Sequence, residues 1–99
     1  MQSRYAAHFT REMGCTAAEL CQWLQGASRG ARIEFSPEGA RVQWQAHLLQ
    51  LSWVPLPERR IALVRLPRLS VTFDFGLTPD AERHAFMKHF DLYTQRGGG

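Results

Sequence analysis

Apolar residues recur every three or four positions between residues 16 and 26, which is the spacing of one face of a helix. The stripe consists of Leu20, Trp23, Leu24 and Ala27. Thr16 and Glu19 stand at the spacing of a capping box, in which each side chain accepts a hydrogen bond from the other residue's backbone N–H. This pattern predicts a helix over residues 16–26.

Apolar and polar residues then alternate, which is typical of a strand with one buried face. The alternation covers residues 31–35 and returns over residues 42–46, with the turn signal Ser36-Pro37-Glu38-Gly39 between them. We expect an antiparallel hairpin here. Its inward-facing residues would be Ile33, Phe35, Val42 and Trp44. The apolar phase shifts near Ala46-His47, which indicates a turn or a bulge.

Prolines interrupt the apolar pattern that follows. Residues 49–53 continue as a third strand, which we expect Pro55 and Pro57 to end, because proline cannot donate a ladder hydrogen bond. Residues 61–64 are consecutive apolar residues, and Pro67 then indicates an edge, a bulge or a break. The next stretch, from Leu69 to Phe75, alternates cleanly and predicts a final strand.

The two ends of the chain differ in how clearly the sequence predicts their secondary structure. Thr78-Pro79-Asp80 combines a capping hydroxyl, a proline at the first helical position and an acid at the positive end of the helix dipole. It predicts a helix over residues 78–92. Apolar residues in the stretch 1–14 have helical spacing, but an extended conformation fits that stretch as well. The glycines at 97–99 are expected to form a mobile tail.

Taken together, these elements predict a single α+β domain over residues 1–96. Strands that are joined by short turns pair antiparallel, and two amphipathic helices can cover one face of such a sheet. We expect a two-layer sandwich with a four- to five-stranded antiparallel meander sheet. An N-terminal and a C-terminal helix would pack on one face, and the other face would be wet.

Composition is that of an ordinary globular domain. Of the 99 residues, 44% are hydrophobic, which argues against a disordered chain. The net charge is +3, and arginine supplies eleven of the twelve basic residues, with acids interspersed among them. We find no secretory signal and no apolar run that could span a membrane. We therefore expect a cytoplasmic protein without membrane contact, whose Cys15 and Cys21 are reduced and structural.

Candidate catalytic chemistry is sparse. The Cys and His spacings match no zinc hairpin, so we predict no metal and no cofactor. Cys15 precedes a predicted helix N-terminus, which can lower the pKa of a thiol, although packing beside Leu20 explains it equally well. His89 with Glu82 could do acid–base work, but such a histidine more often packs at the margin of a core. A small enzyme or ligand-binding protein using Cys15 or His89 is therefore an alternative, and we expect a non-enzymatic protein.

The wet sheet face suggests a second function. Arg32, Arg41 and Arg68 would lie on it together with hydroxyl and amide side chains, which can contact nucleic-acid phosphates. RNA-reading sheets also expose aromatic residues for base stacking, whereas the aromatic residues here follow the inward phase. Nucleic-acid binding through this arginine-bearing face is thus an alternative rather than the main hypothesis.

Surplus apolar residues favour an interaction function. Residues 61–64 and the pair Trp53-Val54 are consecutive apolar residues, whose side chains would lie on both faces of a strand. One layer of helices cannot cover all of them. Either the N-terminal segment with Tyr5 and Phe9 covers them, or a second chain does. We therefore expect a protein-interaction or oligomerisation module, as a homodimer or with an unidentified protein partner. The candidate contact residues are Trp53, Val54, Leu56, Ile61, Leu63 and Val64.

Overall fold

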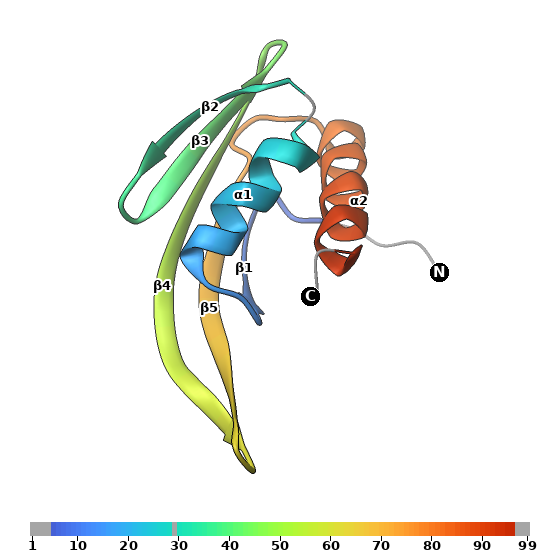
Figure 1. Cartoon of the computed structure of the whole chain (residues 1–99). Helices are drawn as coiled ribbons and strands as arrows, with labels where there is room; N and C mark the ends of the chain where they lie inside the picture. The colour runs from blue at the N-terminus through green and yellow to red at the C-terminus, as the bar shows by residue number, and fades with distance from the viewer. Residues whose placement is uncertain (1–4, 29, 97–99) are drawn as a thin grey trace.

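The computed structural model describes residues 5–28 and 30–96, and it consists of one antiparallel sheet with both helices on one of its faces (Figure 1). The predicted α+β two-layer arrangement is therefore confirmed. In chain order the elements are β1 (His8–Met13), α1 (Ala17–Ala27), β2 (Arg32–Ser36), β3 (Gly39–Trp44), β4 (His47–Ile61), β5 (Val64–Asp74) and α2 (Asp80–Arg96). The glycine tail at 97–99 lies outside the described residues.

The sheet has five strands in the order β1-β5-β4-β3-β2, and every neighbouring pair is antiparallel. Strands β2 to β5 form the expected meander. The fifth strand comes from the stretch whose conformation the sequence left open, and it pairs with β5 so that Phe9 lies opposite Phe73. A spacing of four residues places side chains on one face of a strand as well as on one face of a helix. Apolar residues at that spacing therefore did not distinguish the two.

Helix α1 forms for the reason that the sequence indicated. The backbone N–H of Glu19 donates to Thr16 Oγ1 at 3.2 Å, and the backbone N–H of Thr16 donates to Glu19 Oε1 at 2.9 Å. This reciprocal pair satisfies N–H groups that have no partner within the helix. The apolar stripe of α1 faces the sheet, and Leu20 and Leu24 are fully buried there.

The core lies between the sheet and the two helices. Phe73 stacks on Phe9 with ring centroids 4.9 Å apart and meets Phe90 of α2 edge-on at 5.6 Å. At the margin of this core, Asp91 of α2 accepts hydrogen bonds from the Tyr5 hydroxyl and from Arg11, each at 2.8 Å. These bonds fix β1 against α2, so the N-terminal segment is held as the edge strand beside β5.

The expectation that Pro55 and Pro57 end a strand is wrong, because β4 continues through both and β5 continues through Pro67. The N–H of Trp53 points toward β3, where it donates to the carbonyl of Glu38. Two residues on, the nitrogen of Pro55 faces the same side, but β3 has ended there and no partner needs an N–H. Pro57 lies within a bulge of β4 between residues 56 and 59.

The same reasoning applies to β5. The N–H of Phe75 donates to Ala7, so odd-numbered nitrogens of β5 face β1, which ends opposite Leu69. Pro67 therefore lies beyond the end of β1, where its missing N–H costs no hydrogen bond. The run at 61–64 is the tip of the hairpin rather than one strand. Ile61 and Val64 form its last pair, and Ala62 adopts a positive φ of 54° in the turn.

Candidate functional site

The far half of the β4–β5 hairpin extends past both helices and past the other three strands (Figure 1). We call residues 54–68 the arm. Neither β3 nor β1 pairs with these residues, because β3 ends opposite Ser52 and β1 ends opposite Leu69. The two strands of the arm therefore pair only with each other, and both of their outer edges are open.

The arm exposes large apolar side chains. Val54 is 62% exposed and Leu63, at the tip, is 100% exposed. Ile61, Val64 and Leu66 are also exposed, and Leu56 is half-buried. Single exposed apolar residues are common on soluble proteins, but a contiguous group usually marks an interaction surface.

The pairing register places most of this apolar surface on one face of the arm. Directly paired residues share a face, and Leu69, Val71 and Phe73 of β5 point to the helices. The even-numbered residues of β5 and their partners therefore lie on the outer face, opposite the helices. Five apolar residues belong to it: Val54, Leu56, Ile61, Val64 and Leu66. Arg60 and Arg65 pair with each other on the helix-side face, so the arm is amphipathic.

The arm also carries the net charge of the protein. It contains four arginines and one glutamate, a net charge of +3, which equals the formal charge of the whole chain. The remaining residues balance to zero. None of Arg59, Arg60 and Arg65 forms an ion pair with another residue in the described part of the chain.

Arg68 fixes the base of the arm. Its Nε and Nη2 donate to the two carboxylate oxygens of Glu12 on β1, each at 2.9 Å, and its Nη1 donates to the carbonyl oxygen of Pro57 at 3.2 Å. The hydrogen bonds from Arg68 hold the pKa of Glu12 below its ordinary value. One guanidinium thus joins β1, β4 and β5 where the arm leaves the body.

Five of the six predicted contact residues lie in the arm, and the sixth, Trp53, is in the core at 3% exposure. Trp53 therefore does not belong to the exposed surface. Sequence reasoning missed Leu66, although its alternation with Val64 could have indicated it. Tyr5 and Phe9 pack against α2 and β5, so the part of the N-terminal segment that the structure describes does not cover the arm.

The predicted arginine face is balanced by acids. Arg32, Arg41 and Arg68 do lie on the outer sheet face, as their register positions show. Arg68 is paired with Glu12, and Arg41 lies 3.9 Å from Glu34. The structure therefore places Arg41 and Arg68 beside carboxylates, which lowers the positive potential of that face, whereas Arg32 forms no ion pair among the described residues.

The residues that the sequence suggested for catalysis or metal binding either pack in or against the core or lie in separate parts of the fold. Cys15 is 1% exposed, and burial raises the pKa of its thiol to about 11. Burial also raises the pKa of Cys21. A raised thiol pKa opposes nucleophilic reactivity. Both cysteines are unpaired, and no three Cys, His, Asp or Glu side chains of the described residues are grouped to hold a metal ion.

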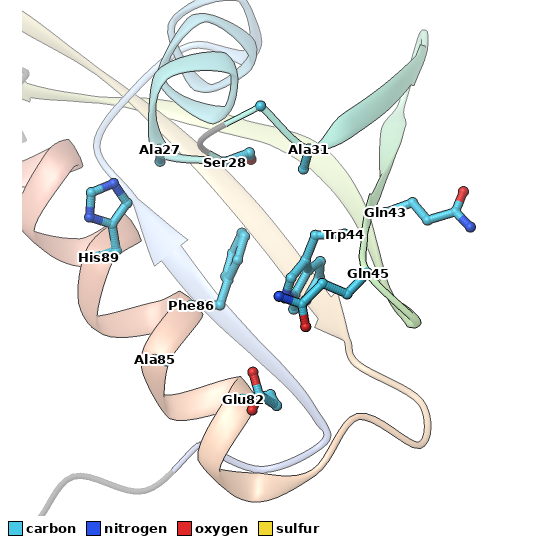
Figure 2. Close-up of a pocket in the computed structure, with 11 residues that line it drawn as sticks. Ala27, Ser28, Ala31, Gln43, Trp44, Gln45, Glu82, Ala85, Phe86 and His89 are labelled. Atoms are coloured by element: carbon cyan, nitrogen blue, oxygen red, sulfur yellow. The ribbon is translucent and has the colours of Figure 1, made fainter.

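His89 and Glu82 line a cavity of about 480 Å³ between α1, α2 and the end of β3 (Figure 2). Cys15 is not part of its lining. The structure therefore separates the two residues considered for catalysis.

No family model, curated protein or solved structure matches the chain. Among the described residues, no helix is long and apolar enough to cross a membrane.

Proposed function

We propose that the protein is a non-enzymatic self-association module in which the arms of two copies pack against each other. The observation that carries this proposal is the outer face of the arm, where five apolar side chains lie together and four of them, Val54, Ile61, Val64 and Leu66, are exposed among the residues that the structure describes. The burial of one such side chain is worth roughly 1.5–3 kcal/mol. Contact between two outer faces would bury several of them at once.

The charges of the arm are compatible with this contact. Arg60 and Arg65 lie on the opposite face and would stay in solvent when two outer faces meet. Arg68 is on the outer face, but Glu12 already balances its charge. Arg59 is on the outer face without an ion pair among the described residues, but its charge acts on Glu12, so self-association is not opposed by the full charge of the arm.

A closed dimer is the assembly that these features favour. A two-fold axis would place the same face of each copy in contact, which limits the assembly to two chains. The prolines at the open edges, Pro55, Pro57 and Pro67, disfavour the addition of further strands. The two unpaired cysteines are consistent with the cytoplasmic location that we propose for this dimer.

The test is light scattering after gel filtration, from micromolar to near-millimolar protein. We expect a monomer–dimer equilibrium for the wild type and a monomer for Val64→Asp. Leu77→Asp is the matched control, because Leu77 is a fully exposed apolar residue outside the arm. It should dimerise like the wild type. A wild type that stays monomeric throughout, or equal loss of dimer in both variants, would contradict the proposal.

The charge of the arm supports nucleic-acid binding as a second candidate. A two-stranded ribbon fits the major groove of duplex DNA, and this ribbon carries a net charge of +3 with Arg60 and Arg65 side by side. Here the Arg60→Glu, Arg65→Glu double variant should lose salt-dependent DNA binding yet keep its dimer. Arg32→Glu, on the balanced sheet face of the body, is the control. Absence of salt-dependent DNA binding by the wild type would eliminate this candidate.

A further inference from the structure

The cavity of about 480 Å³ lies where the C-terminal end of α1, the end of β3 and one side of α2 meet (Figure 2). It is remote from the arm in the sequence, and none of its lining residues belongs to the arm. Its size is within the range of cavities that hold small organic molecules. The dimer proposal does not use it, so its role is a separate question.

Two aromatic rings form one wall of the cavity. Trp44 at the end of β3 and Phe86 of α2 are stacked, with ring centroids 5.1 Å apart and planes inclined by 25°. Figure 2 shows the Phe86 ring extending from α2 beside Trp44, and small residues complete this part of the lining. Those residues are Ala27, Ala31 and Ala85. Aromatic rings and alanine methyl groups offer an apolar contact surface, and the faces and edges of aromatic rings favour contact with another ring.

Ser28 supplies a polar group that the protein itself does not satisfy. Its backbone N–H donates to the carbonyl of Leu24 at 3.0 Å, and its carbonyl accepts from Ala31 at 3.1 Å. The residue is only 8% exposed, yet its hydroxyl has no hydrogen-bond partner in the structure. Buried hydroxyls nearly always have a partner, and rotation of the Ser28 side chain about its Cα–Cβ bond would let this one hydrogen-bond to a polar atom of a ligand in the cavity.

The charge of the cavity limits what can bind there. Glu82 contributes a carboxylate at the end opposite Ser28, and the lining residues that the structure describes include no arginine or lysine. A carboxylate disfavours a neighbouring anion and attracts a cation. A ligand that complements the aromatic wall, the hydroxyl of Ser28 and the carboxylate of Glu82 has a flat ring, a polar ring atom and an amino group.

We propose that this cavity binds a small aromatic or heteroaromatic amine. Its ring would pack against Trp44 and Phe86, its amino group would face Glu82, and a polar ring atom would hydrogen-bond to the hydroxyl of Ser28. Neutral amide groups nearby, such as that of Gln45, add further hydrogen-bonding capacity at the rim.

The experiment is an NMR titration of the labelled protein with three probes that share one ring. Tryptamine is the cation, indole is neutral and indole-3-acetate is the anion. We expect tryptamine to shift the signals of Trp44 and Ala85 and to bind more tightly than indole, with indole-3-acetate weakest. Glu82→Gln should reduce tryptamine affinity about threefold to fivefold and leave indole unchanged.

Two further variants test the location. Ala85→Leu fills the cavity from an exposed helix position and should abolish tryptamine binding, whereas Ala81→Leu, on the same helix but outside the lining, should not. Ser28→Ala should weaken binding without loss of stability, because it removes an unsatisfied hydroxyl. The proposal is overturned if tryptamine does not bind at millimolar concentration, if indole-3-acetate binds as well, or if Ala85→Leu binds normally.

Discussion

The two halves of the β4–β5 hairpin use similar residues for opposite purposes. In the body of the sheet, Leu49, Leu51 and Trp53 are buried under the helices, whereas Val54, Ile61 and Val64 in the arm are exposed. The strand pairing continues through both halves, so backbone hydrogen bonding does not explain the difference. The difference comes from the face that the side chains occupy. The three buried residues point to the helices, whereas the three exposed residues point to the outer face of the sheet, which neither helix covers. The body is therefore expected to hold the stability of the protein, and the arm its interactions.

The largest expected effect compares one substitution in the two halves. Leu49→Ala, in the body, should cost about 2–5 kcal/mol of unfolding free energy, because Leu49 is fully buried and its loss leaves a cavity. Leu63→Ala, at the tip of the arm, should change it by less than about 0.5 kcal/mol. Urea denaturation at low protein concentration measures both values. Similar losses in the two variants would show that the arm is part of the folded core.

The second effect concerns the pH dependence of the body. The unfolded thiol of Cys15 has a pKa of 9.0, and burial raises it to about 11 in the folded protein. The neutral thiol therefore contributes stability that is fully present below pH 9 and is lost as pH rises toward 11. This loss amounts to about 2–3 kcal/mol.

Cys15→Ala isolates that contribution, because Cys21 and Tyr5, whose pKa values are also raised, remain in both proteins. We expect the wild type to lose more stability than Cys15→Ala between about pH 8 and about pH 11, measured by thermal unfolding. Parallel losses in the two proteins would mean that the Cys15 thiol is not buried.

The sequence predicted those parts of the fold that depend on local chemistry. The capping box at Thr16 and Glu19 located α1, and alternation located the β2–β3 hairpin and the buried phase of β5. The continuation of β4 through Pro55 and of β5 through Pro67 could not be predicted from local chemistry. Whether a proline is tolerated there depends on where β3 and β1 end, which is set by strands elsewhere in the chain.

The candidate sites, like the fold, could be predicted from the sequence only where a local pattern of residues decides the structure. The arm could be anticipated from its excess of apolar residues, but the assignment of Trp53 failed because adjacent residues of a strand face opposite sides. Trp53 continues the alternate positions of Leu49 and Leu51 along the strand, so its side chain lies in the core with theirs. The cavity had no sequence signal, since Ser28, Trp44 and Phe86 come from three separate segments that meet only in the folded chain.

The third effect tests how tightly the body is packed. A Cβ at Gly39 would lie 2.5 Å from the carbonyl oxygen of Leu51, which is backbone and cannot move aside easily. Gly39→Ala should therefore cost about 1–3 kcal/mol. Gly14→Ala is the control, because its Cβ would meet only ordinary contact distance, 4.0 Å from Pro67. Denaturation curves in which Gly39→Ala is as stable as Gly14→Ala would contradict the close packing of β3 on β4.

The smallest effect lies at the boundary between the two halves, where Glu12 holds Arg68. Both side chains are on the surface, so removal of their pairing should leave global stability nearly unchanged. Glu12→Gln should instead loosen the base of the arm, because the neutral amide keeps one acceptor oxygen, so Arg68 loses one of its two hydrogen bonds to residue 12 and the charge that strengthens the other. NMR relaxation should show greater fast motion for residues 54–68 and no change in the helices. The pKa of Glu12 is lowered in the folded protein, so the same loosening should appear in the wild type only as pH falls through that lowered pKa, which lies below the ordinary value of 4.5. If the arm is equally rigid in the wild type and in Glu12→Gln, its orientation is set by the strand pairing alone.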